Sequence, residues 1–244
     1  MARKPALAPD TPDGPAVTTR ASAVYGRLRA DIAHGVLEPG SKLRVEAMVQ
    51  RYGVGASPLR EALSRLSAEG LVDRTDQRGF RVAALKWDEL PTLTHNRIQL
   101  ETLALRESVA ARDQAWEDQL VLLVHRLSRT PRSLSDAQYQ PNPAWEDLHR
   151  DFHRALLARC PSRWMRGFCD TLSEEAYRFR QLAAGKSFSK RNEHVEHVAI
   201  FEAAIAGNAD EAVRLLSEHY SRTSTLVATQ ARKRGQAARS ADSN

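Results

Sequence analysis

The chain has 244 residues, 42% of them hydrophobic, which is enough for one large or two small domains with their own cores. Its apolar runs are too short to cross a bilayer and its N-terminus lacks the apolar segment of a secretory signal, so we expect a cytoplasmic protein without a membrane partner. The net charge of +6 is uneven, with 13 basic and 9 acidic residues in 1–85 but 19 and 20 in 86–228. A basic N-terminal third is typical of nucleic-acid-binding domains, although a soluble basic domain without such a partner has the same charge.

Four regions are expected along the chain. Residues 1–20 and 229–244 are predicted to be disordered tails, because the first is rich in proline and the second, which is basic, has no apolar stripe. Residues 21–85 combine short helical patterns with turn glycines and a β-like stretch, whereas 86–228 contains successive long amphipathic patterns. The predicted fold class is mainly α, with an N-terminal winged helix-turn-helix followed by an all-α antiparallel helical bundle.

Residues 45–71 predict a helix-turn-helix. Val45, Met48 and Val49 predict a short helix, which is followed by the turn "YGVGAS", where Gly53 suits a left-handed conformation. Ser57 is expected to cap a second helix with Pro58 at its first position. Leu59, Leu63 and Leu66 should face inward. After Gly70, two short strands joined by a glycine-containing turn predict a hairpin wing.

The polar side chains of this module predict binding to double-stranded DNA. The N-terminus of a helix fits the major groove and offers free N–H groups to phosphate, while wing arginines can lie on the backbone or in the minor groove. A module that mediates only protein contacts is the alternative. The candidate DNA-binding residues are Ser57, Arg60, Glu61, Ser64 and Arg65 on the second helix, and Arg74, Arg78 and Arg81 on the wing.

The sequence "GASPLREALSRLSAEGLV" followed by "RGFRVA" resembles the winged helix of GntR-family transcriptional regulators. The resemblance covers about 65 residues and includes Pro58, Arg60, Glu61 and Gly70. It departs from the family pattern at Gly55 and Ala56, where the family usually has a serine or threonine and an arginine. Because that arginine often contacts DNA in the family, the resemblance implies that Ser57, Arg60 and the wing carry more of the base recognition here.

The second block predicts about six antiparallel helices. Apolar stripes indicate helices within 96–113 and 116–127, a third over 144–159 and a fourth that Ser162 could cap. A further helix should end at Gly207, and Asn208 with Glu211 should cap the last one, over 209–228. Cys160 and Cys169 are too few for a disulfide framework and are expected to be buried thiols.

Four histidines of this block fall on inward helix faces. His149 and His153 stand four apart beside the apolar stripe of one helix, which alone is more typical of a structural pair than of a metal site. His197 and His219 lie on the inward faces of two further helices, and buried imidazoles need partners, which a divalent cation supplies. We therefore predict a metal site formed by His149, His153, His197 and His219, with His194 as a further ligand or outer partner.

The sequence around these histidines argues against an enzyme. A zinc protease of the H-E-x-x-H type needs a glutamate where this chain has Arg150. The chain also shows no Ser-His-Asp order, phosphate loop or dinucleotide fingerprint. A metalloenzyme fused to a winged helix is the remaining enzymatic alternative.

The helical block also resembles the FCD effector domain of the FadR subgroup of GntR regulators, on Arg97 to Glu101, His149 to His153, Glu196-His197 and His219. The resemblance implies metal ligands at His153, His197 and His219, with His149 where an aspartate is usual. This histidine variant is similar to the carbon-starvation-induced regulator type, repressors that respond to glutarate or 2-hydroxyglutarate.

Taken with the winged helix, this resemblance predicts a homodimeric repressor with a small carboxylate effector, a dicarboxylate or hydroxy acid. The effector would bind at a divalent ion, zinc or alternatively nickel, with Arg97 and Arg178 as clamps on its anionic groups. The alternative is a DNA-binding dimer that senses no effector and whose histidines are structural.

Overall fold

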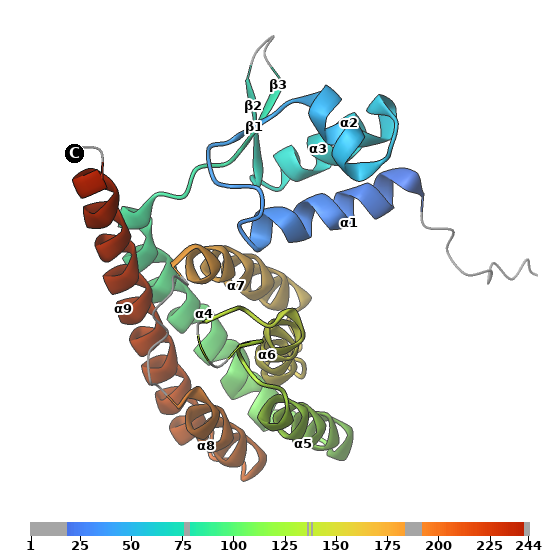
Figure 1. The fold of residues 1–244 in the computed structure, drawn as a ribbon. Coiled ribbons are helices and arrows are strands. Elements are labelled where there is room, and N and C mark those ends of the chain that lie inside the picture. Colours follow the sequence, from blue (N-terminus) through green and yellow to red (C-terminus); the bar gives the residue numbers. More distant parts are fainter. Residues whose placement is uncertain (1–18, 76–78, 136, 138, 184–191, 242–244) are drawn as a thin grey trace, which may run out of the picture. The chain divides into compact units, whose positions relative to one another are not determined.

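The computed structural model describes residues 19–75, 79–135, 137, 139–183 and 192–241 and is mostly helical (Figure 1). Its contacts divide the chain into two compact units, one built on the chain up to residue 31 with 40–83, the other on 32–39 with 84 onward. Among the described residues, no helix combines the length and apolar character needed to span a membrane.

The first unit is a winged helix-turn-helix. Its elements are α1 (Arg20–Ala33), β1 (Lys42–Leu43), α2 (Val45–Tyr52), α3 (Ala56–Ala68), β2 (Val72–Thr75) and β3 (Gly79–Val82). The three strands form an antiparallel sheet in the order β1-β3-β2, in which Leu43 pairs with Phe80. The hairpin of β2 and β3 is the predicted wing, whereas β1 was not predicted because two residues are too few to show an alternating pattern.

The predicted turn is confirmed, but the predicted start of α3 is wrong by two residues. Gly53 closes α2 with a φ of 65°, a left-handed conformation that glycine adopts without strain. Gly55 is the N-cap of α3, so Ser57 lies inside the first helical turn and does not cap it. Pro58 fits this turn because the first N–H groups of a helix need no intrahelical acceptor. Leu59, Leu63 and Leu66 are fully buried, as predicted.

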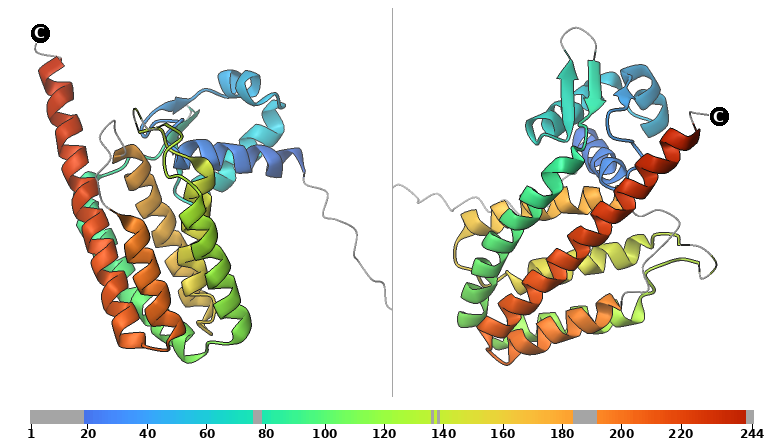
Figure 2. Two further views of the ribbon diagram at one scale, coloured as in Figure 1. Left: turned by 60° about the horizontal axis from the view of Figure 1, so that its bottom comes forward. Right: turned by 90° about the vertical axis from the view of Figure 1, so that its left-hand side faces the viewer.

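The described residues of the second unit contain six α-helices after a short 3-10 turn at Trp87–Glu89. They are α4 (Leu90–Ala110), α5 (Gln114–Arg129), α6 (Pro143–Leu156), α7 (Arg163–Ala183), α8 (Glu193–Ile205) and α9 (Ala209–Ala241). Helix α4 packs along α7 and α9, α8 along α9, and α5 along α6 and α8 (Figure 2). The predicted all-α bundle is confirmed.

Polar caps define where several of these helices begin. The side chain of Ser162 accepts a hydrogen bond from the backbone N–H of Met165 at 3.2 Å, and that of Asn208 accepts one from Glu211 at 3.2 Å, so both predicted caps are confirmed. Asp113 and Asn142 cap α5 and α6 in the same way.

Helix α9 is longer than expected. The apolar pattern predicted an end at residue 228 and a disordered tail over 229–244, but the helix continues to Ala241. The added segment, "TQARKRGQAARSA", is rich in alanine, arginine, lysine and glutamine, which have high intrinsic helix propensity. An apolar stripe is therefore not needed to prolong a helix that packing has already nucleated.

One hydrophobic core joins the helices of the second unit. Leu105 of α4, Trp116 of α5, Phe152 of α6, Ile200 of α8 and Leu216 of α9 are all buried in it. The indole N–H of Trp116 donates to the backbone carbonyl of Ala155 at 2.7 Å, which ties α5 to α6 and satisfies the only polar atom of that ring. Phe152, Ile200 and Leu216 stand next to or near the histidines in sequence, so the core positions those side chains.

Candidate functional site

Four buried histidines from three helices meet in the second unit. His149 and His153 come from α6, His197 from α8 and His219 from α9, and one ring nitrogen of each lies within 4.8 Å of the others. The Nε2 atoms of His149 and His153 are 3.2 Å apart, and the ring centroids of His197 and His219 are 4.8 Å apart. The structure therefore brings together the four residues that the helical periodicity indicated. His194 is exposed on α8 and is not part of this cluster.

Apolar and aromatic neighbours hold the rings in place. Trp145, one turn before His149 on α6, stacks on its ring with centroids 4.8 Å apart and an angle of 14° between the planes. Phe152 is fully buried and contacts the rings of both His153 and His197 edge-on. The i, i+4 spacing on α6 places His149 and His153 on one face, so these neighbours fix the two rings together.

Outer hydrogen bonds orient two of the rings. The Nδ1 atom of His219 lies 2.9 Å from a carboxylate oxygen of Glu196. The Nδ1 atom of His153 lies 3.1 Å from the hydroxyl of Tyr220, which in turn donates to Glu101. Such partners on the far nitrogen leave Nε2 available for a metal ion, as in most histidine-liganded sites.

Glu101 is a buried carboxylate that connects α4 to this network. Its oxygens accept from Nε of Arg97 at 2.7 Å and from Nη2 at 3.3 Å, and the guanidinium of Arg97 lies over the Tyr220 ring, 4.1 Å from its centroid. Sequence reasoning used Arg97 and Glu101 as a motif but missed Tyr220, because a tyrosine next to His219 carries no signal of its own.

Burial governs the protonation of this cluster. It lowers the pKa of His149 well below its usual value of 6.5, and Arg180 and the neighbouring rings lower it further. Burial also lowers the pKa of His153 in the same way, with further contributions from His219 and His197. For Tyr220, burial and then the negative charge of Glu101 raise the pKa well above 10.0. The two imidazoles on α6 are therefore neutral at pH 7, the form that binds metal ions.

The donor set fits a divalent transition-metal ion. Zinc–nitrogen bonds of about 2.0–2.1 Å place tetrahedral ligand atoms about 3.4 Å apart, which is close to the 3.2 Å between the two Nε2 atoms on α6. Neutral imidazoles suit zinc, nickel, copper and iron rather than magnesium or calcium, which prefer oxygen ligands.

Two cavities adjoin the histidines. The first, of about 50 Å³, is lined by His149, His153, His219 and three arginines, Arg97, Arg150 and Arg180. The second, of about 230 Å³, shares Arg150, His153 and Ser173 with it. Arg97 thus lies where the sequence placed it, beside the histidines.

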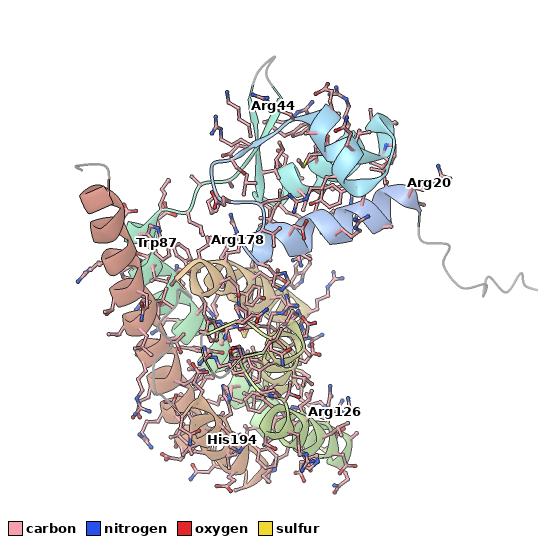
Figure 3. The ribbon with its side chains drawn as sticks, viewed as in Figure 1. Arg20, Arg44, Trp87, Arg126, Arg178 and His194 are labelled. Atoms are coloured by element: carbon pink, nitrogen blue, oxygen red, sulfur yellow. The ribbon has the colours of Figure 1, made fainter. Side chains whose placement is uncertain are left out.

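Arg178 lines neither of these cavities. It is buried on α7, where its guanidinium pairs with Glu175 at 3.0 Å, at the opposite end of the helical unit from His194 (Figure 3). Arg180, two residues later, pairs with Glu146 and reaches His149. Residues two apart on a helix point to nearly opposite sides, so only one of these two arginines can face His149, and the sequence does not show which.

The first unit exposes its candidate DNA-binding residues on α3. Ser57, Arg60, Glu61, Ser64 and Arg65 are all exposed, and the guanidinium of Arg65 lies over the ring of Tyr25, 4.0 Å from its centroid. On the wing, Arg74 is exposed, whereas Arg81 is half-buried and donates to the backbone carbonyl of Gly40. Arg78 lies outside the described residues.

Arg44 is an exposed arginine that sequence reasoning missed (Figure 3). It stands at the N-cap of α2, directly after β1. The sequence predicted no strand before α2, so nothing in the pattern indicated that this arginine is exposed. Its charge adds to the basic character of the unit.

Comparisons with known proteins match both units. Residues 20–82 match the family described as "Bacterial regulatory proteins, gntR family", and residues 92–222 match the FCD domain. The chain is 40% identical to the HTH-type transcriptional regulator BphR of Paraburkholderia xenovorans (strain LB400), over 84% of each chain. It is 30% identical to the HTH-type transcriptional repressor GlaR of Escherichia coli (strain K12), over 80% of this chain and 90% of that protein.

A solved structure has the same fold. The E. coli McbR/YncC structure superposes with a TM-score of 0.71 at 18% identity, over 86% of this chain and 97% of that one.

Proposed function

The chain belongs to the GntR family of bacterial transcriptional regulators, with an FCD domain after its DNA-binding domain, and from this premise we propose a homodimeric repressor that senses a small carboxylate at a metal centre. Like its relatives, it is a DNA-binding regulator and not an enzyme. The observation that carries the proposal is the meeting of four buried histidines with a cavity lined by three arginines. Repression is proposed because GlaR, a relative of similar length, is a repressor.

The metal centre is proposed to hold zinc, with nickel as the alternative. His153, His197 and His219 are the proposed ligands, and His149 stands at the fourth corner of the cluster. A bound divalent ion would supply a positive charge and an open coordination position for a carboxylate oxygen. Buried imidazoles leave that charge uncompensated, which favours an anionic effector.

The sizes of the cavities support a small acid as the effector. A bound water needs about 10–15 Å³ of cavity volume, so the first cavity has room for about four non-hydrogen atoms, enough for a carboxylate group and the carbon that carries it. The larger cavity, which shares Arg150, His153 and Ser173 with the first, would hold the remainder of a dicarboxylate or hydroxy acid.

The arginines position the effector and add little net charge. Arg97 pairs with Glu101, Arg150 with Asp147 and Arg180 with Glu146, so each positive charge already has a partner. We therefore propose that the ion attracts the carboxylate and that the N–H groups of Arg97 and Arg150 orient it. Arg178 has no proposed contact with the effector.

Operator recognition is proposed to use α3 and the wing. Arg60 is the strongest candidate for a base contact because it is exposed on the outer face of α3 and its planar fork can donate two hydrogen bonds to guanine. Ser57, Ser64, Arg65 and Arg74 would contact phosphates or neighbouring bases. Arg81 is proposed to stabilise the sheet, since it donates to the backbone of Gly40.

An exposed apolar surface supports a dimer. Trp164 and Phe168 of α7 are 67% and 60% exposed, and Leu103 of α4 is 46% exposed. A groove of about 370 Å³ beside them is lined by Leu100, Phe168 and Leu172. Large apolar side chains gathered on one face are typical of an interface, and a symmetric dimer would present two winged helices to two half-sites.

The proposal is tested by a thermal-shift screen of small dicarboxylates and hydroxy acids, run with and without a chelator. A sensor should be stabilised by an acid only when the ion is present, and the same acid should change its affinity for operator DNA. The variant His153→Ala with His197→Ala should lose the ion and the stabilisation, whereas His194→Ala, which changes an exposed histidine three residues from His197, should retain both. Equal metal content in wild type and the double variant would favour structural histidines instead.

A further inference from the structure

The hydrogen bonds across the histidine cluster form a chain in which each group donates to the next, from Arg180 to Glu101. At one end, Nη1 of Arg180 lies 3.2 Å from Nδ1 of His149. A guanidinium has five donors and no acceptor, so Nδ1 of His149 must accept this bond. Arg180 is held for this contact by its ion pair with the buried carboxylate of Glu146.

This bond determines where His149 carries its proton. A neutral imidazole has one N–H group, and because Nδ1 accepts, the proton lies on Nε2. That nitrogen faces the cluster and lies 3.2 Å from Nε2 of His153. His149 therefore presents a proton, and not a lone pair, to the centre.

His153 has the opposite arrangement. The hydroxyl of Tyr220 donates to Glu101, so its oxygen must accept from the Nδ1–H group of His153, 3.1 Å away. Glu101 does not reverse this order, because both of its oxygens also accept from the guanidinium of Arg97. The proton of His153 is thus on Nδ1 and its Nε2 lone pair points inward, as does that of His219, whose Nδ1 lies 2.9 Å from Glu196.

We propose that His149 is not a metal ligand but a hydrogen-bond donor to the carboxylate oxygen that occupies the open position of the ion held by His153, His197 and His219, and that Arg180 fixes its tautomer. The inference rests on the metal centre proposed above and goes beyond it by assigning the fourth histidine. An ion bound to Nε2 of His153 would occupy the lone pair that accepts the hydrogen bond from His149 in the metal-free protein. The Nε2–H group then needs a new acceptor, which a carboxylate oxygen supplies.

The distances alone do not separate a ligand from a donor. The 3.2 Å between the two Nε2 atoms also suits two ligands of one ion. For His149 to coordinate the ion, however, its proton would have to move from Nε2 to Nδ1. The Nδ1–H group would then face an N–H group of Arg180, which places two donors together without an acceptor. Where the family usually has an aspartate, this chain thus has a donor in place of an acceptor.

The first test locates the ring protons without any metal. Nitrogen-15 NMR of histidine-labelled, chelator-treated full-length protein should show the Nε2–H tautomer for His149 and the Nδ1–H tautomer for His153. The double variant Arg180→Met with Glu146→Gln removes both members of the ion pair and leaves no buried charge unpaired, and it should abolish the preference at His149. An Nδ1–H tautomer at His149 in the wild type would overturn the inference.

The second test compares zinc affinity after the same substitution at two positions of one helix face. By chelator competition, His153→Gln should weaken zinc binding more than about a hundredfold, and His149→Gln by no more than about tenfold, as for an outer partner. On zinc-loaded protein, His149→Gln should also weaken binding of glutarate or 2-hydroxyglutarate about tenfold.

The outcomes separate this inference from the function on which it rests. If the wild type holds zinc and the two glutamine variants lose it equally, His149 is a ligand and only the inference fails. If the wild type takes up no zinc, the proposed metal centre itself is wrong and the inference falls with it.

Discussion

Tyr220 is the residue on which the order of the proposed metal centre depends most directly. It is buried, contacts His153 through its hydroxyl and accepts the guanidinium of Arg97 on its ring face. It therefore joins a ring of the cluster to the carboxylate of Glu101 on another helix. A single hydroxyl group thus links α6, α4 and α9 at the site.

Tyr220→Phe should weaken zinc binding about tenfold without unfolding the protein. The change removes the partner of Nδ1 of His153, so the ring loses its orientation, whereas Glu101 keeps its ion pair with Arg97. Chelator competition measures the effect. Tyr52→Phe, which removes a tyrosine hydroxyl bonded to Asp31 in the other unit, is the control and should leave the affinity unchanged. Equal affinity in the Tyr220 variant and the wild type would contradict this role.

At this scale the sequence predicted the histidine cluster better than the side chains around it. The four histidines could be found because each stands on the inward face of a helix with a clear apolar stripe. The contacts of Arg180 with His149 and of Glu196 with His219 could not, because they depend on the rotation of α7 and α8 against α6 and α9. Periodicity gives the inward face of a helix but not which neighbouring side chain it meets.

Helix α3 is the element that we propose recognises DNA. Its inner face is fully buried, so Arg60 can be changed without loss of core contacts. Glycine closes the turn before it at Gly53 and also provides its N-cap at Gly55. The helix is thus fixed by backbone conformation and apolar packing, and its outer face is left for contacts.

Arg60→Ala should lower affinity for the operator about ten- to hundredfold, because a two-donor contact with guanine contributes about 1–3 kcal/mol. Fluorescence anisotropy with labelled operator measures the loss, and the melting temperature should not change. Arg126→Ala, which removes an exposed arginine of α5, should leave operator affinity intact. A similar loss in both variants would indicate an effect of charge alone.

The sequence predicted the type and order of the helices but not all of their ends. Caps with a side-chain acceptor, such as Ser162 and Asn208, were located correctly because they are chemically specific. The start of α3 was missed because Gly55 acts through backbone conformation only. The extension of α9 was missed because a segment without an apolar stripe has the same pattern as a disordered one, even where its residues have high helix propensity.

Acid stability is a property of the whole molecule that follows from the buried histidines. Burial, followed by Arg180 for His149 and by the other rings for His153, lowers both pKa values well below the usual 6.5. Between these lowered values and 6.5, the unfolded chain binds more protons than the folded one. The free energy of unfolding therefore falls as the pH falls below about 6.5.

The metal-free protein should accordingly melt at a lower temperature at pH 5 than at pH 7, with up to two protons taken up on unfolding. Calorimetry at several pH values checks this. Substitution of both His149 and His153 by phenylalanine should flatten the dependence, whereas His125→Ala, at an exposed position, should not. A melting temperature that does not change with pH would contradict the neutral, buried state of these rings.

Assembly is the second property at this scale. Phe168→Asp should convert a dimer to monomers, because it places a charge in the centre of the exposed apolar surface of α4 and α7. Sedimentation velocity gives the mass. Val121→Asp, at an exposed apolar position of α5, is the matched control and should remain dimeric. A dimeric Phe168 variant would place the interface elsewhere.

The length of α9 has a mechanical consequence. The helix carries His219 of the histidine cluster and continues without interruption to Ala241, 22 residues later. At 1.5 Å per residue this segment is about 33 Å long, so a tilt of about 5° at His219 moves the far end by about 3 Å. A ligand that tilts the helix by shifting His219 a fraction of an ångström would therefore displace the C-terminal end of the helix by a larger distance.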